Sequence, residues 1–178
     1  MESVKFISII WLLPLIFMLH DFEEIIFLEW WVDKERLVLF KKYPKIAKQY
    51  GELSTAGFAL AVSEIFIVII LITLTAVIFK WYYLWFGITI TFFVHLIMHL
   101  IQWIIYKKYI PAITTVIPAM IYSVYAICFI YNNSNMEILP IIMWSVLSMV
   151  IFFINLLFVH KLAEKFTKFL RGAKNKYN

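Results

Sequence analysis

Residues 54–79 read STAGFALAVSEIFIVIILITLTAVIF, and Glu64 is the only charged residue among them. A transmembrane helix needs about 20 mainly apolar residues to cross the hydrocarbon layer of a bilayer. This run exceeds that length, so we expect it to form a membrane-spanning helix. Other stretches of the same character predict further spans, and together the five cover residues 4–31, 54–79, 81–106, 110–131 and 138–159.

The composition of the whole chain is typical of a helical membrane protein. Of its 178 residues, 64% are hydrophobic and 15% are charged, against about 45–50% apolar and 25% charged residues in soluble domains. The single cysteine, Cys128, excludes an internal disulfide and a structural zinc site built from thiolates. We therefore predict an all-α polytopic bundle that forms one membrane domain over residues 1–178, and we exclude an ordinary soluble enzyme.

The distribution of Lys and Arg predicts the orientation of the spans. Two of the 16 basic residues, Lys5 and Lys80, fall on one side of a five-span arrangement, and all the others fall on the opposite side. Because basic residues mark the cytoplasmic side, we expect the N-terminus outside and the C-terminus in the cytoplasm of a multi-pass protein of the inner or plasma membrane. This placement accounts for the net charge of +5 without a nucleic-acid partner.

Two segments outside the spans, residues 33–51 and 160–171, alternate apolar and basic residues at helical spacing. In the second of them, Leu162, Phe166 and Leu170 share one helix face. Such segments favour short helices that lie at the membrane interface, in contact with membrane lipid.

The spans contain ionisable residues but, apart from Lys5 at the outer end of the first span, no Lys or Arg. Their acidic residues and histidines are His20, Asp21, Glu23, Glu24, Glu29, Glu64, His95 and His99. Ionisable groups inside a bilayer are costly and by default mark a functional interior. Asp21 and Glu29 fit positions near the interface, so we assign them no function.

The spacing of the remaining groups predicts that they converge. His20, Glu23 and Glu24 stand at i, i+3 and i+4 and so share one helix face, as do His95 and His99 at i and i+4. At about 1.5 Å per residue, His20 and His95 lie roughly 22 Å and 21 Å from the outer ends of their spans. The two groups therefore share a level in the cytoplasmic half of the membrane.

Histidines and carboxylates on facing helices are the ligand set of metal sites in helical bundles. We predict a divalent metal, zinc or iron, bound by ligands from His20, Glu23, Glu24, His95 and His99. A carboxylate left over from the ligand set would act as the general base, which makes Glu23 and Glu24 candidate catalytic residues.

Three further polar residues lie near this level. Glu64 is expected in a cavity, as a ligand or as a proton carrier, and we count it among the candidate catalytic residues. Gln102 and Asn155 are more typical of hydrogen bonds between helices. Gly57 and Ala61 share the face of Glu64 at a spacing that lets two helices approach closely.

Residues 20–24, His-Asp-Phe-Glu-Glu, read H-x-x-E-E, and in this small polytopic chain they resemble the HXXEE-motif family of bacterial membrane proteins. That family is also described by a further histidine, which would be His95 or His99, and by a Y-x-P-G motif. Residues 109–112, Tyr-Ile-Pro-Ala, resemble that motif with Ala112 in the place of the glycine. The family's function is recorded as unknown, so the resemblance implies no activity.

Three functions from different classes agree with these features. The first is a membrane-embedded metal-dependent enzyme, above all a hydrolase, that acts on a lipid or another hydrophobic small molecule; an iron-dependent oxidation would use the same ligands. The second is a small transporter or a relay for protons or metal ions, which would require a homo-oligomer because five spans are few for a complete transporter. The third is a lipid-binding accessory protein without catalytic activity.

Overall fold

The computed structural model describes residues 4–51 and 53–177, and these residues form helices without any strand. The helices are α1 (Val4–Lys34), α2 (Arg36–Lys42), α3 (Pro44–Gly51), α4 (Thr55–Phe79), α5 (Tyr82–Tyr106), α6 (Ile113–Asn133) and α7 (Ile138–Tyr177). Five of them, α1, α4, α5, α6 and α7, are long and apolar enough to cross a membrane. The predicted all-α membrane bundle with five spans is confirmed.

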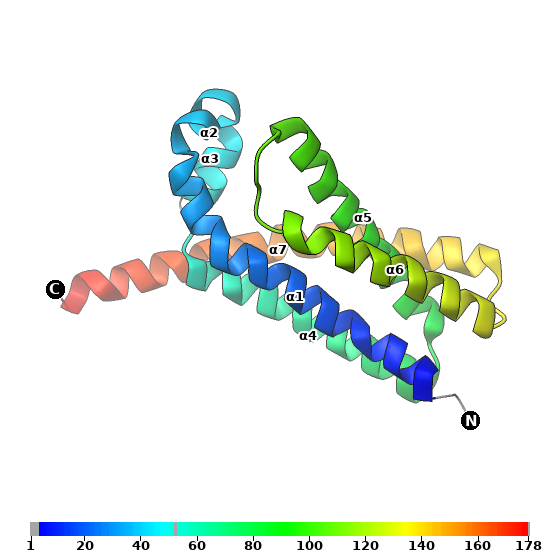
Figure 1. The fold of residues 1–178 in the computed structure, drawn as a ribbon. Helices are drawn as coiled ribbons and strands as arrows, with labels where there is room; N and C mark the ends of the chain where they lie inside the picture. Colours follow the sequence, from blue (N-terminus) through cyan, green and yellow to red (C-terminus); the bar gives the residue numbers. More distant parts are fainter. Residues whose placement is uncertain (1–3, 52, 178) are drawn as a thin grey trace.

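The five long helices form a closed ring. Around the ring, α1 packs against α4, α4 against α7, α7 against α5, α5 against α6, and α6 against α1 (Figure 1). The short helices α2 and α3 pack on each other and on α1, and Figure 1 shows them at the C-terminal end of α1. This order brings α1 and α5, which carry the predicted ligands, into contact across the bundle.

The core lies between α1, α5 and α6. Ile10, Leu13, Trp85 and Leu96 are fully buried there. The Trp85 indole donates a hydrogen bond to the Ile10 carbonyl oxygen at 3.3 Å, and the Tyr122 hydroxyl donates to the Ile9 carbonyl oxygen at 2.9 Å. Close packing and hydrogen bonds between helices hold such a bundle together in lipid, where the solvent is as apolar as the side chains.

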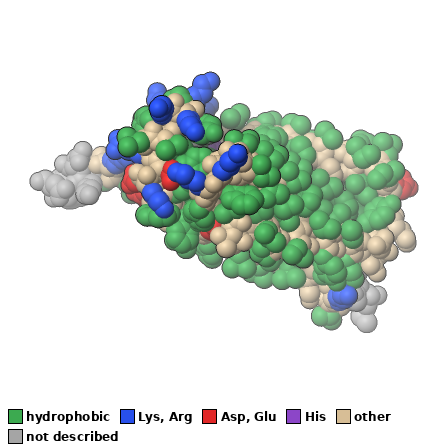
Figure 2. Space-filling view, turned by 45° about the horizontal axis from the view of Figure 1, so that its top comes forward, with side chains coloured by type: hydrophobic (Ala, Val, Ile, Leu, Met, Phe, Trp, Pro, Cys, Tyr) green, Lys and Arg blue, Asp and Glu red, His purple; other side chains and the backbone are tan. Residues whose placement is uncertain are grey.

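The outer surface is apolar along the body of the molecule. Figure 2 shows hydrophobic side chains over most of the visible face, with most of the visible Lys and Arg side chains at the end that carries α2 and α3. Large side chains such as Ile67, Ile121 and Leu157 are exposed on α4, α6 and α7. An exposed apolar belt with a basic end is the surface of a membrane protein.

The start of α6 and the end of α7 differ from the sequence prediction. Helix α6 begins at Ile113 rather than at residue 110, because Ala112 adopts a left-handed backbone conformation with φ of 79°. Helix α7 continues without a break from the predicted span 138–159 through the predicted interfacial segment 160–171. No proline or glycine interrupts it between Pro140 and Gly172, so the chain has no local reason to leave the helix.

Two glycines let α7 approach its neighbours closely. A Cβ atom at Gly87 of α5 would lie 2.7 Å from the carbonyl oxygen of Trp144. A Cβ atom at Gly57 of α4 would lie 2.8 Å from the carbonyl oxygen of Ala163 and would also overlap the hydroxyl of Thr167. The close approach expected at Gly57 is therefore present, and α7 is its partner.

Candidate metal centre and adjoining cavity

Three histidines meet where α1 packs against α5. One ring nitrogen from each of His20, His95 and His99 lies within 4.8 Å of the other two. The Nε2 atoms of His95 and His99 are 2.9 Å apart, and the His20 ring stands edge-on to both rings. The structure thus brings together all three histidines that the sequence predicts as metal ligands.

The hydrogen bonds of His20 fix which of its nitrogens is free. Its Nδ1 lies 3.1 Å from the hydroxyl of Thr115, and that hydroxyl lies 2.8 Å from Oε2 of Glu23. The same hydroxyl lies 3.0 Å from the Ala112 carbonyl oxygen. A carbonyl oxygen and an ionised carboxylate can only accept, so the one proton of Thr115 is donated to them and its oxygen accepts from His20. The lone pair of His20 is then on Nε2, which is buried and has no hydrogen-bond partner.

Glu23 caps the start of α6. Its Oε1 accepts hydrogen bonds from the Tyr109 hydroxyl at 3.0 Å and the Thr114 backbone N–H at 3.2 Å. Its Oε2 accepts from the Thr115 backbone N–H at 2.9 Å as well as from the Thr115 hydroxyl. Free N–H groups and the helix dipole stabilise a negative charge at this position. Both oxygens are engaged by α6 and Tyr109, which is a different arrangement from the direct metal ligation predicted for Glu23.

Tyr109 is held in this network from both of its ends. Its backbone oxygen accepts a hydrogen bond from the Trp31 indole at 2.9 Å, while its hydroxyl donates to Glu23. Burial raises the pKa of the Tyr109 hydroxyl, and the hydrogen bond and the negative charge of Glu23 raise it further. Tyr109 therefore remains a hydrogen-bond donor.

Glu24 faces the histidines. Its Oε1 lies 3.4 Å from Nε2 of His99. The neighbouring carboxylates on α1 thus have different surroundings, with Glu23 at the end of α6 and Glu24 beside the three histidines.

A cavity of about 470 Å³ opens beside this cluster. Apolar side chains from α1, α4, α5 and α7 form most of its wall, and the polar residues that line it are Asp21, Glu24, Tyr43, Tyr50, His95, His99, Gln102, Tyr106 and His160. Burial raises the pKa of Tyr50 to about 12, with a further contribution from the charge of Glu24. The Tyr50 phenol is therefore protonated and can donate a hydrogen bond within the cavity.

Asp21 is the main residue that the sequence prediction missed. It is 5% exposed, it lines the cavity, and its Oδ2 has no hydrogen-bond partner. From the sequence we assigned Asp21 no function, but the structure buries it, because α1 packs against α4 on one side and α6 on the other. Its position one residue after His20 was the signal that could have placed it near the site.

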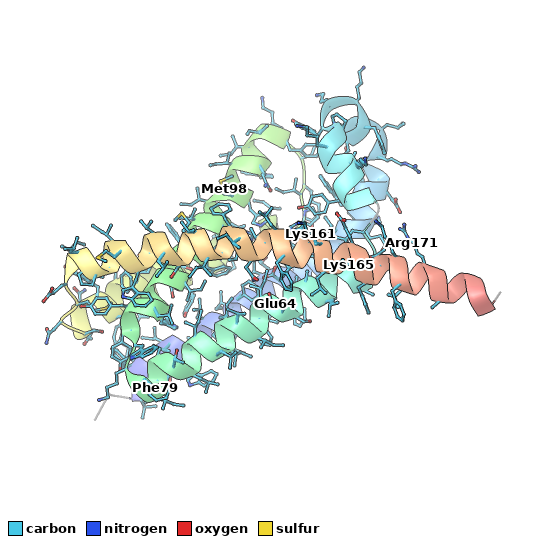
Figure 3. All side chains as sticks on the ribbon, turned by 180° about the vertical axis from the view of Figure 1, so that it is seen from behind. Glu64, Phe79, Met98, Lys161, Lys165 and Arg171 are labelled. Carbon is cyan, nitrogen blue, oxygen red and sulfur yellow. The ribbon has the colours of Figure 1, made fainter. Side chains whose placement is uncertain are left out.

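Glu64 lies outside this site as far as the described residues show. It belongs neither to the three-histidine group nor to the residues that line the cavity. Its Oε2 instead accepts a hydrogen bond from the Asn155 side-chain amide at 2.9 Å, which links α4 to α7 (Figure 3). The interhelical hydrogen bond expected for Asn155 is present. Among the described contacts, Glu64 makes none with the three histidines that would support its predicted catalytic role.

The two motif elements of the sequence meet at this site. Ala112, at the glycine position of the Y-x-P-G element, has the left-handed φ of 79° that favours glycine. The turn it makes directs the first N–H groups of α6 toward Glu23. A family model described as a protein of unknown function with an HXXEE motif matches residues 11–126. The chain belongs to the HXXEE family.

The match to the HXXEE family runs from α1 into α6 and includes the three histidines, Glu23, Glu24 and Tyr109. The part of the cavity wall that α7 contributes lies outside the matched residues. The chain matches no curated protein and no solved structure.

Proposed function

We propose that this protein is a membrane-embedded metal-dependent hydrolase that acts on a lipid or another hydrophobic substrate. The observation that carries the proposal is the convergence of three histidines, two of which, His95 and His99, line a largely apolar cavity together with Glu24. We place the protein in the inner or plasma membrane, with the N-terminus outside, so that the site faces the cytoplasmic half.

The donor set suits zinc or iron. His20, His95 and His99 supply three imidazole ligands, and three histidines with one open position are the ligand set of a catalytic zinc. The free Nε2 of His20 supports this assignment, because a ligating histidine usually donates its other N–H to a hydrogen-bonded partner, as His20 does to Thr115. A metal held there would polarise a bound water and the substrate carbonyl.

Glu24 is the proposed general base. It takes one proton from the water, whose oxygen forms a new bond to the carbonyl carbon of an ester or amide. The bond from that carbon to the leaving oxygen or nitrogen then breaks, and the proton held by Glu24 passes to the leaving group. Water is consumed, and one acid and one alcohol or amine are released, without any change in oxidation state.

A second candidate function is a relay of protons or metal ions. Asp21 and Glu24 line the same cavity as His95, His99 and His160, so ionisable groups from α1, α5 and α7 share one space. Flux of protons or metal ions through the protein in liposomes, without turnover of any lipid, would favour this function over hydrolysis.

The test of the metal site is elemental analysis of detergent-purified protein. We expect about one zinc or iron ion per chain. The His95→Ala variant should lose the ion. The matched control is His160→Ala, because His160 lines the same cavity but bonds the Leu156 carbonyl and lies outside the three-histidine group. Wild-type protein without metal, or equal loss in both variants, would contradict the proposal.

A further inference from the structure

The charged side chains that line the cavity are all acidic or histidine. Asp21 and Glu24 line it, whereas no Lys or Arg does so among the residues that the structure describes. Phosphate and sulfate groups are recognised in proteins by the charged hydrogen bonds of Arg and Lys. Among the described residues, the cavity therefore lacks the cationic donors that recognise an anionic head group.

Asp21 lines the cavity and has a carboxylate oxygen without a hydrogen-bond partner. The residue is 5% exposed, and its Oδ2 is buried. A buried polar atom left without a partner is costly, so a ligand group that donates to this carboxylate would be stabilised.

The charge balance with a metal excludes a strongly charged ligand of either sign. In the proposed enzyme, a divalent ion bound by three neutral histidines would be balanced by the carboxylates of Asp21 and Glu24. The charge of Glu23, which does not line the cavity, is stabilised separately by four hydrogen bonds at the start of α6. No net charge then remains to offset a phosphate or an ammonium group, and an unpaired charge is very costly to bury. An alcohol, ester or amide carries no such cost, and the O–H group of an alcohol or the N–H group of an amide can also donate to Asp21.

Two apolar residues that line the cavity are exposed on the outside of the bundle. Met98 and Ile105 of α5 line the cavity, yet they are 49% and 62% exposed, and Gln102 lies between them on the same helix face. In Figure 3, Met98 lies close to where α5 crosses α7. Two large apolar residues at the rim favour entry from the hydrocarbon layer, because a water-facing entrance would be polar.

We propose that the substrate of this site is a hydrophobic molecule whose polar group is uncharged, and that it enters from the bilayer beside Met98. The inference rests on the proposed metal-dependent function and adds the substrate class to it. The cavity volume of about 470 Å³ lies in the range of sites that enclose small ligands.

The test uses zinc-loaded full-length protein in nanodiscs and a photoreactive long-chain ester as the probe. Competitors share one alkyl chain and differ in the head group, which is a methyl ester, a phosphate or a trimethylammonium. We expect the ester to compete at least about tenfold better than either charged compound. Equal competition by the phosphate, or best competition by the ammonium, would overturn the proposed substrate class.

The entrance is tested with Met98→Trp, which should lower labelling by the probe about tenfold. The matched control is Ile101→Trp, since Ile101 is 41% exposed on the same helix but does not line the cavity. Equal labelling of both variants would overturn the entrance. Metal content measured on the same samples separates the two proposals. If zinc is bound but the protein does not select uncharged over charged head groups, this inference is contradicted. If no zinc is bound, the metal-dependent function is contradicted.

Discussion

Nδ1 of His20 and the hydroxyl of Thr115 lie 3.1 Å apart, and this contact joins the candidate metal site to the start of α6. Thr115 also donates to Glu23, so the carboxylate acts on the histidine through one hydroxyl. The contact fixes the orientation of the His20 ring and leaves its Nε2 without a hydrogen-bond partner, as the partners of metal-binding histidines do. Glu23 and Thr115 are positioning residues in this account.

Loss of the Thr115 hydroxyl should weaken metal binding more than it affects the fold. We expect Thr115→Val to lower zinc affinity roughly 10- to 100-fold, the range found when such outer partners are removed. Thr115→Ser keeps the hydroxyl and should therefore keep the zinc affinity of the wild type. The measurement is zinc retention against a competing chelator.

The control for this prediction is Thr91→Val, because the buried Thr91 hydroxyl bonds only the Gly87 carbonyl oxygen of its own helix among the contacts described. Equal zinc retention by Thr115→Val and wild type would show that Thr115 does not orient His20.

Glu23 and Glu24 should respond differently to replacement by glutamine. Glu23→Gln puts an amide among four donors and removes the charge at the start of α6, so we expect a stability loss of about 1–2 kcal/mol. Glu24→Gln should keep the metal and the melting temperature but abolish turnover, because an amide cannot accept the proton. Thermal unfolding, metal content and ester hydrolysis measured in one detergent separate the two. A small and identical effect of both variants would refute the division of roles.

Ala112 should be more stable as glycine. At φ of 79°, a residue with a Cβ atom loses about 1–2 kcal/mol of stability through backbone strain. Glycine avoids this strain, but its greater freedom in the unfolded chain costs about 0.5–1 kcal/mol. We expect Ala112→Gly to raise the melting temperature slightly and Ala112→Val to lower it. Thermal unfolding of the three proteins is the measurement, and the reverse order would mean that the turn before α6 differs from this structure.

Gly87 should not tolerate a larger residue. A Cβ atom there would lie 2.7 Å from the Trp144 carbonyl oxygen, and backbone of α7 cannot move aside easily. Gly87→Ala should therefore cost about 1–3 kcal/mol of stability. Gly172→Ala is the control, because no atom lies within 4 Å of a Cβ atom at that position. If both variants unfold at the same temperature, α7 does not pack closely on α5.

The sequence predicts the five spans and the three histidines because both depend on local periodicity. A spacing of four residues puts His95 and His99 on one face, and helix rise puts His20 at their level. Neither position depends on which helices are neighbours in the bundle.

The roles of the carboxylates depend on the order of helices around the ring, which periodicity does not contain. Glu23 is a cap because α6 lies beside α1 and begins after the left-handed turn at Ala112. Glu64 meets Asn155 because α7 lies beside α4. Asp21 is buried because α1 has neighbours on two sides. Each of these facts follows from tertiary packing.

The central claim is that His20, His95 and His99 bind one metal ion, and X-ray absorption at the zinc edge tests it most directly. For zinc-loaded protein we predict about three imidazole nitrogens at roughly 2.0–2.1 Å from the ion. His20→Ala should remove one of these imidazoles or the ion itself. A shell of oxygen ligands without imidazole scattering, unchanged by His20→Ala, would contradict the account.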